Sequence, residues 1–103
     1  AFEEAHLNLG LVREEQGRND EAIASFQKAL TIKPRLRGAN LFLGIAEYRM
    51  NQLDLAASAL RKETAYFPKD AGAWMWLGVV ELAKSQPEEA AQREEQQTAH
   101  QQR

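Results

Sequence analysis

The sequence predicts an all-α protein in which antiparallel helix pairs stack into a solenoid. Three observations support this prediction. A leucine–glycine pair recurs at an interval of 34 residues, as Leu9-Gly10, Leu43-Gly44 and Leu77-Gly78. The apolar residues between these pairs follow the spacing of amphipathic helices. Turn-forming residues divide each block of 34 residues into two such segments, which is typical of stacked helical repeats.

The period divides the chain of 103 residues into three blocks, 3–36, 37–70 and 71–103. This length allows one compact domain or one short array, which we take to span 1–103, and not two independent cores. The last segment, AQREEQQTAHQQR, has no large apolar residue, so it is either a solvated cap that ends the array or a poorly ordered or non-native tail. We favour a cap as far as about Glu94, with fraying beyond about residue 95.

The first block contains two predicted helices. The first carries an apolar stripe through Leu7 and Val12, and the turn at residues 17–19 ends it, because glycine suits the left-handed conformation that closes a helix. Asp20 is the expected cap of the second helix, and Pro34 stops that helix.

The second and third blocks repeat this plan with other residues. Asn51 replaces the turn glycine, Asp54 is the expected cap of the next helix, and Pro68 closes the second block. Asp70 precedes the first helix of the third block as its cap. Pro87 opens the following helix, where proline is tolerated because the first N–H groups have no partner within the helix.

A glycine inside a helix costs roughly 1 kcal/mol relative to alanine, so its recurrence requires a reason in the packing. We expect Gly10 and Ala22 to lie where the two helices of a block cross, which lets their backbones approach, while Leu9 and Phe26 fill the flanks. Burial of apolar area around the crossing offsets the loss. The residues expected to pack the repeats in this way are Leu9, Gly10, Ala22, Phe26, Leu43, Gly44, Ala56, Leu60, Leu77, Gly78 and Ala90.

These residues resemble a tetratricopeptide repeat. The segment NLGLVREEQGRNDEAIASFQKALTIKP is similar to the family pattern, in which Leu-Gly in the first helix is followed by alanine, aromatic, alanine and proline positions. The matching residues are Leu9, Gly10, Gly17, Ala22, Phe26, Ala29 and Pro34, then Leu43, Gly44, Ala56, Leu60 and Pro68, and then Trp74, Leu77, Gly78 and Ala90. The resemblance covers all but the last dozen residues and implies a right-handed superhelix of three repeats.

The chain departs from the family pattern in three columns. The family's early tryptophan is replaced in the first two blocks by His6 and Asn40. Its tyrosine, three places after the glycine, is replaced by Arg13, Glu47 and Glu81. In the second block Glu63 stands where a small residue is usual.

The resemblance implies that function lies in a concave groove lined by the first helix of each repeat. The partner-binding residues expected there are Leu7, Leu11, Glu14, Leu41, Ile45, Tyr48, Arg49, Met75, Val79 and Leu82. An apolar centre of this kind suits an amphipathic helix or a short apolar segment. Family members that grip the acidic end of a chaperone need cationic and amide side chains, but the matching positions here are Leu7, Leu11, Phe42, Gly72 and Trp76. We therefore predict that no chaperone tail binds.

The expected function is a non-catalytic protein–protein interaction scaffold whose partner is another protein or peptide segment. Three alternatives stay open: the groove is filled by the rest of its own chain, the chain is a homo-oligomer that self-assembles, or it is an accessory segment that positions substrate within a larger enzyme. We expect no cofactor, no metal and no catalytic residue. His6 and His100 lie outside any metal-binding motif, and the six glycines are too dispersed for a phosphate-binding loop.

Net charge, the length of apolar runs and the cysteine count indicate which classes of partner and which compartments are compatible with the sequence. The net charge is −2 with scattered cations, which disfavours nucleic acid and anionic membranes as partners. The longest apolar run, 73–80, is too short to span a bilayer, and the chain shows no secretory leader. The absence of cysteine leaves the compartment open, cytoplasm and periplasm alike. Since the chain begins at alanine and ends in a glutamine-rich tail, we expect it to be a piece of a longer protein.

Overall fold

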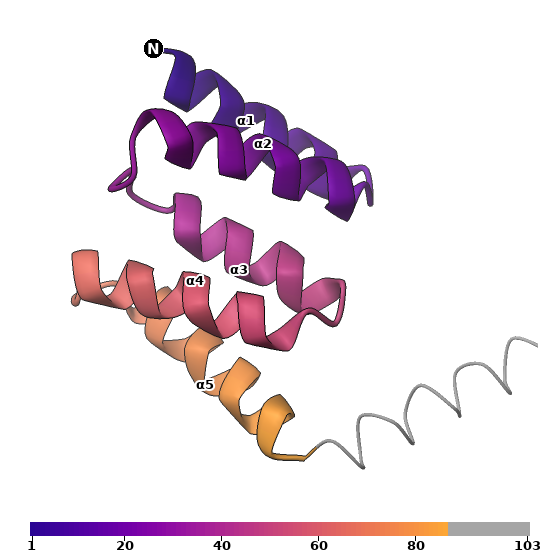
Figure 1. Cartoon of the computed structure of the whole chain (residues 1–103), viewed down its shortest axis with the longest axis vertical. Helices are drawn as coiled ribbons and strands as arrows, with labels where there is room; N and C mark the ends of the chain where they lie inside the picture. Colours follow the sequence, from indigo (N-terminus) through magenta and orange to yellow (C-terminus); the bar gives the residue numbers. More distant parts are fainter. Residues whose placement is uncertain (87–103) are drawn as a thin grey trace, which may run out of the picture.

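The computed structural model describes residues 1–86 of the chain. Within this range the chain forms five helices and no strand: α1 (Phe2–Glu15), α2 (Asn19–Ile32), α3 (Ala39–Arg49), α4 (Leu53–Tyr66) and α5 (Ala71–Ser85). The prediction of an all-α fold of helical repeats is confirmed (Figure 1). The expectations for Pro87, for Ala90, for a cap as far as Glu94 and for fraying beyond residue 95 lie outside the described residues.

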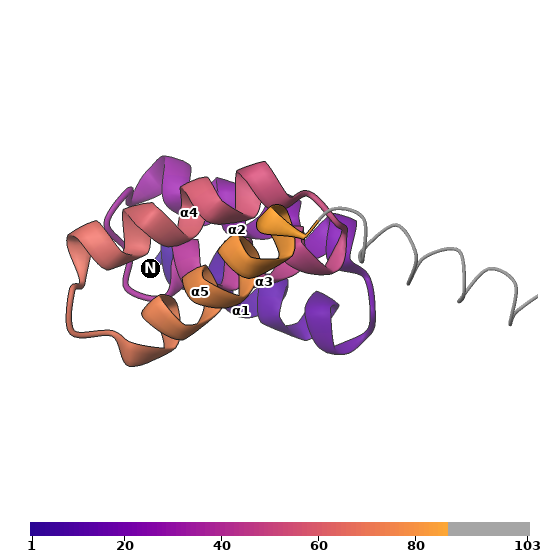
Figure 2. The same ribbon diagram turned by 90° about the horizontal axis from the view of Figure 1, so that it is seen from below.

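The helices form two layers, which are clearest when the molecule is viewed from below (Figure 2). One layer holds α1, α3 and α5, and the other holds α2 and α4. Helix α1 packs on α2 and α3 packs on α4, while contacts of α2 with α3 and of α4 with α5 join successive pairs. We call the outer side of the first layer the first-helix face and the outer side of the second layer the second-helix face.

Three of the predicted turn and cap residues behave as expected. Gly17 and Asn51 have φ angles of 77° and 59°, in the left-handed region that ends the first helix of each pair. Asp70 caps α5, because its Oδ1 accepts a hydrogen bond from the backbone N–H of Ala73 at 3.2 Å.

The expected caps of α2 and α4 were wrong. Each helix begins one residue before the aspartate, so Asp20 and Asp54 lie in the first turn, and Arg18 and Gln52 occupy the cap positions without a side-chain cap bond. The aspartates still place negative charge at the positive end of the helix dipole. Asp54 also forms an ion pair with Lys84 of α5, with 2.9 Å between Oδ1 and Nζ.

Each glycine of the first two pairs lies under a large side chain from the second helix. A Cβ atom placed on Gly10 would lie 2.5 Å from Cε1 of Phe26, and one placed on Gly44 would lie 2.7 Å from Cγ of Leu60. The atoms nearest these two positions thus belong to Phe26 and to Leu60. The carbonyl oxygen of Ala56 also lies 3.3 Å from the Cβ position of Gly44.

The leucines before the glycines join one helix pair to the next. Leu43 is 8% exposed and packs in a cluster with Ala22 and Phe26 of α2, and Leu77 is 7% exposed in a cluster with Leu60 of α4. Leu9 differs from both: it is 41% exposed and does not fill the flank as expected. The reason is that this column packs against the second helix of a preceding pair, and residues 1–86 contain no helix in that place before α1.

Glu63 links α4 to the start of α3. Its side chain is fully buried, and Oε2 accepts a hydrogen bond of 3.0 Å from the N–H of Gly38, the residue that precedes α3. Burial raises the pKa of Glu63, while the N–H groups of Gly38, Leu41 and Asn40 lower it. Gly38 has no side chain with which to cap its own helix, so a carboxyl group from the partner helix takes this role.

The glycine contacts give a first prediction about stability. We expect Gly44→Ala to lower the free energy of unfolding by about 1–3 kcal/mol, because the added methyl group collides with Leu60 despite the better helix propensity of alanine. The matched control is Gly78→Ala, since among residues 1–86 nothing outside its chain neighbours and the backbone of its own helix lies within 4 Å of its Cβ position. This control should gain up to about 1 kcal/mol. Urea unfolding followed by circular dichroism measures both changes, and equal effects would contradict the packing role of Gly44.

Candidate functional site

A cavity of about 520 Å³ opens on the first-helix face. It is lined by Leu11, Glu14 and Glu15 of α1, by Phe42, Ile45 and Arg49 of α3, and by Trp76 of α5. All three helices of the layer thus contribute to one site. Of the ten residues expected to bind a partner, the structure brings four together here, namely Leu11, Glu14, Ile45 and Arg49.

Two aromatic rings form walls of this cavity, and other rings hold both of them in place. Phe42 stacks on Phe26, with 6.2 Å between ring centroids, and Trp76 meets Tyr48 edge to face at 5.8 Å. The set of residues expected to bind a partner contained neither Phe42 nor Trp76. The sequence could have predicted them, because both residues match positions that, in the resemblance to tetratricopeptide repeats, bind a chaperone tail in the groove. The absence of cationic and amide side chains at these positions excluded such a tail, but the aromatic rings there also predict contact with an apolar ligand.

The charges at the rim of the cavity are paired. Nη1 of Arg49 donates a hydrogen bond to Oε1 of Glu14, which joins α1 to α3. Burial raises the pKa of Glu14, Arg49 lowers it, and the neighbouring Glu15 raises it. Since Arg49 neutralises Glu14, the rim is less acidic than the sequence indicates, and Glu15 is the exposed carboxylate that remains.

The other six expected residues lie in two different environments. Leu7, Leu41 and Tyr48 are half-buried and pack against the hydrophobic clusters between helices. Met75, Val79 and Leu82 are exposed on α5, with 59%, 37% and 59% of their surface accessible. The ten residues therefore do not form one continuous open surface.

The described residues offer no arrangement for metal chemistry. Within residues 1–86 no group of three or more His, Asp or Glu side chains is placed so that it could hold a metal ion. His6 is half-buried in α1, and His100 lies outside the described residues. None of the helices in the described range has the length and apolar character needed to cross a bilayer.

Comparisons with protein families agree with the geometry. A family model described as Tetratricopeptide repeat matches residues 43–101, and a second model with the same description matches residues 3–36. No curated protein matches the chain closely enough to count as a relative. Because the first match alone covers more than half of the 103 residues, and the paired helices fit it, the chain belongs to the tetratricopeptide repeat family.

Proposed function

We propose that the chain is a non-catalytic module that binds an apolar or amphipathic segment of another protein in the cavity between α1, α3 and α5. Tetratricopeptide repeats generally mediate protein–protein interactions and are generally not catalytic. The observation that carries the proposal is the cavity of about 520 Å³, which is lined by the aliphatic side chains Leu11 and Ile45 together with the aromatic rings of Phe42 and Trp76. A cavity of this size accepts one or two large apolar side chains.

The aromatic walls favour binding because they are already ordered. Phe42 and Trp76 each pack on another ring, so little side-chain entropy is lost when a ligand covers them. An amphipathic helix presents apolar side chains three or four residues apart along one face, which suits a site made by three neighbouring helices. At the rim, Arg49 keeps 47% of its side chain exposed, so a polar group of the partner can reach it while Glu14 stays paired.

A second copy of the chain is the competing occupant. Met75 and Leu82 are each 59% exposed on α5 and lie seven residues apart, which places them on the same side of this helix. The hypothesis of an accessory segment in a larger enzyme concerns sequence outside this chain and stays a prediction.

Peptide selection tests the proposed cavity. We expect peptides selected from a random phage-displayed library to carry apolar residues spaced by three or four positions. Leu11→Gln should weaken their binding at least 10-fold, or about 1.4 kcal/mol, because the polar amide replaces an apolar wall of the cavity. Ile32→Gln is the control, since Ile32 is 50% exposed on α2 and does not line this cavity. We prefer Leu11 to the buried Ile45, 8% exposed, because a polar group there would also unfold the protein. Equal affinities of the two variants would overturn the proposal.

Sedimentation equilibrium separates a partner protein from self-association. The proposal predicts a monomer at all accessible concentrations, because the cavity is kept for a different chain. A dimer that dissociates when Met75→Glu is introduced would instead assign the apolar face of α5 to self-assembly.

A further inference from the structure

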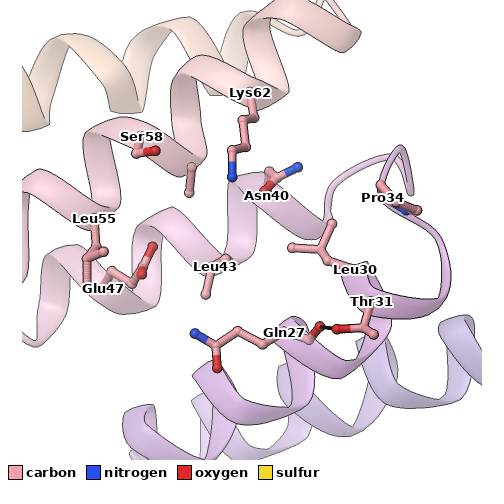
Figure 3. A pocket seen from close by; sticks show the side chains of 11 residues that line it. Gln27, Leu30, Thr31, Pro34, Asn40, Leu43, Glu47, Leu55, Ser58 and Lys62 are labelled. Atoms are coloured by element: carbon pink, nitrogen blue, oxygen red, sulfur yellow. Dashed lines mark hydrogen bonds between the residues drawn. The ribbon is translucent and has the colours of Figure 1, made fainter.

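A second cavity, of about 410 Å³, lies on the second-helix face between α2, α3 and α4 (Figure 3). Helix α3 forms its floor with Leu43 and Glu47, while Gln27 of α2 and Lys62 of α4 stand on opposite walls. Figure 3 shows the carboxylate of Glu47, the amide of Gln27 and the ammonium group of Lys62 around the same space. This cavity is separate from the proposed partner site, which lies on the other face.

Glu47 is unusual for its position. It lies in α3 and lines the cavity, where a carboxyl group is in contact with the aliphatic side chains of other lining residues. The residue is only 3% exposed, and its Oε1 is buried without a hydrogen-bond partner. Rotation about the Cγ–Cδ bond of Glu47 exchanges its two carboxylate oxygens, so one of them can accept a hydrogen bond from a ligand in the cavity. A buried carboxylate oxygen without a donor is unfavourable, and a ligand that brings a donor would relieve this cost.

The repeat itself shows which donor fits this column. Glu81 is the equivalent of Glu47 one period later, and Nη2 of Arg61 in α4 donates to its Oε1 at 3.0 Å across the α4–α5 contact. The equivalent of Arg61 one period earlier is Gln27 in α2. The α2–α3 contact thus has the glutamate without the arginine that accompanies it in the next pair.

We propose that this cavity binds a guanidinium group, the side chain of an arginine in a partner protein, with Glu47 as the anion that holds it. The planar guanidinium presents two parallel N–H donors to a carboxylate and gives up its hydration more readily than an ammonium group. Its methylene stem would lie along Leu30, Leu43 and Leu55, which line the same cavity.

Glu47 is the anion that a cationic ligand would meet in this cavity. Among the lining residues only Glu47 and Lys62 carry charge, since Gln27 and Thr31 of α2 and Asn40 of α3 are neutral. Lys62 is exposed, and within residues 1–86 no ion pair joins it to Glu47. Lys62 repels either cation, so net charge does not distinguish them. The guanidinium is favoured because it is more weakly hydrated and presents two parallel N–H donors to the carboxylate.

The pH dependence of stability tests the state of Glu47. Burial raises the pKa of Glu47 to about 7, although the positive charge of Lys62 opposes the shift. A carboxyl whose pKa is raised by folding contributes its full stability below its ordinary value of 4.5 and loses it as the pH rises through about 7. We therefore expect the melting temperature of the wild type to fall between pH 5 and pH 8. Glu47→Gln should make this fall smaller, and the fall that remains belongs to Glu63 and Glu14, whose pKa values burial also raises. Glu81→Gln is the control and should leave the fall in melting temperature unchanged. Parallel curves of melting temperature against pH for the wild type and Glu47→Gln would contradict the claim that burial raises the pKa of Glu47.

Binding is tested by NMR titration at pH 8 with three matched probes: the N-acetyl methylamides of arginine, lysine and citrulline. We expect the arginine probe to shift the Gln27 side-chain amide and the Glu47 carboxyl carbon, and to bind at least 10-fold more tightly than the neutral citrulline probe and several-fold more tightly than the lysine probe. Affinity should fall as the pH drops below 7, because the probe needs an ionised Glu47. Free arginine tests whether the ligand is the side chain of a protein or the free amino acid. If free arginine binds no more tightly than the blocked arginine probe, a side chain of a partner protein is supported. If free arginine binds at least 10-fold more tightly than the blocked probe, the partner protein is ruled out as the source of the guanidinium group.

Two variants make the assignment specific. Glu47→Gln should abolish the response to the arginine probe. Gln27→Arg places a guanidinium in the column that Arg61 occupies one period later, so it should also abolish binding and lower the pKa of Glu47. Leu11→Gln changes the cavity on the first-helix face and should leave probe binding unchanged. Equal binding of the arginine probe to Glu47→Gln and wild type, or shifts confined to the first-helix face, would overturn the proposal.

Discussion

The structure depends on one contact, in which a large side chain of the second helix lies over a glycine of the first. Phe26 covers Gly10 and Leu60 covers Gly44, each at a distance that no additional methyl group could occupy. This contact brings the two helices of a pair close together. The leucine beside each glycine then points away from its own pair, and Leu43 inserts into the cluster formed by the preceding second helix. Packing within a pair and stacking between pairs are therefore two consequences of the same dipeptide.

The two-layer arrangement gives the molecule two unlike faces. On the first-helix face, three helices contribute apolar and aromatic side chains to a single cavity, and the Arg49–Glu14 pair bridges two of these helices at its rim. On the second-helix face, polar and aliphatic side chains together line the cavity, and one of them is the buried carboxyl group of Glu47. Apart from Leu43, the residues that line the two cavities lie outside the recurring leucine–glycine pairs, and one of them, Glu47, departs from the family pattern. The packing columns, by contrast, are nearly the same in both pairs.

Periodicity was sufficient to predict the helices, their pairing and the left-handed turn residues Gly17 and Asn51, because these depend on residues close in sequence. Periodicity could not predict which side chains from different positions of the repeat meet in space. The cap that Glu63 provides for α3 joins residues 25 positions apart, and no local pattern signals it. The exposure of Leu9 depends on what packs before α1, which the residue itself does not encode. Phe42 lines the cavity on the first-helix face and its ring stacks on Phe26, and this contact between two helices cannot be predicted without the packing of α2 on α3.

The most direct test of this account is a double-mutant cycle between Gly44→Ala and Leu60→Ala, measured by urea unfolding. If the side chain of Leu60 excludes a methyl group at residue 44, removal of that side chain should cancel most of the penalty of the alanine. The double variant should then be more stable than the sum of the single changes predicts, by at least about 1 kcal/mol. Additivity within about 0.5 kcal/mol would show that the two residues do not constrain each other, and the proposed origin of the stacked pairs would be wrong.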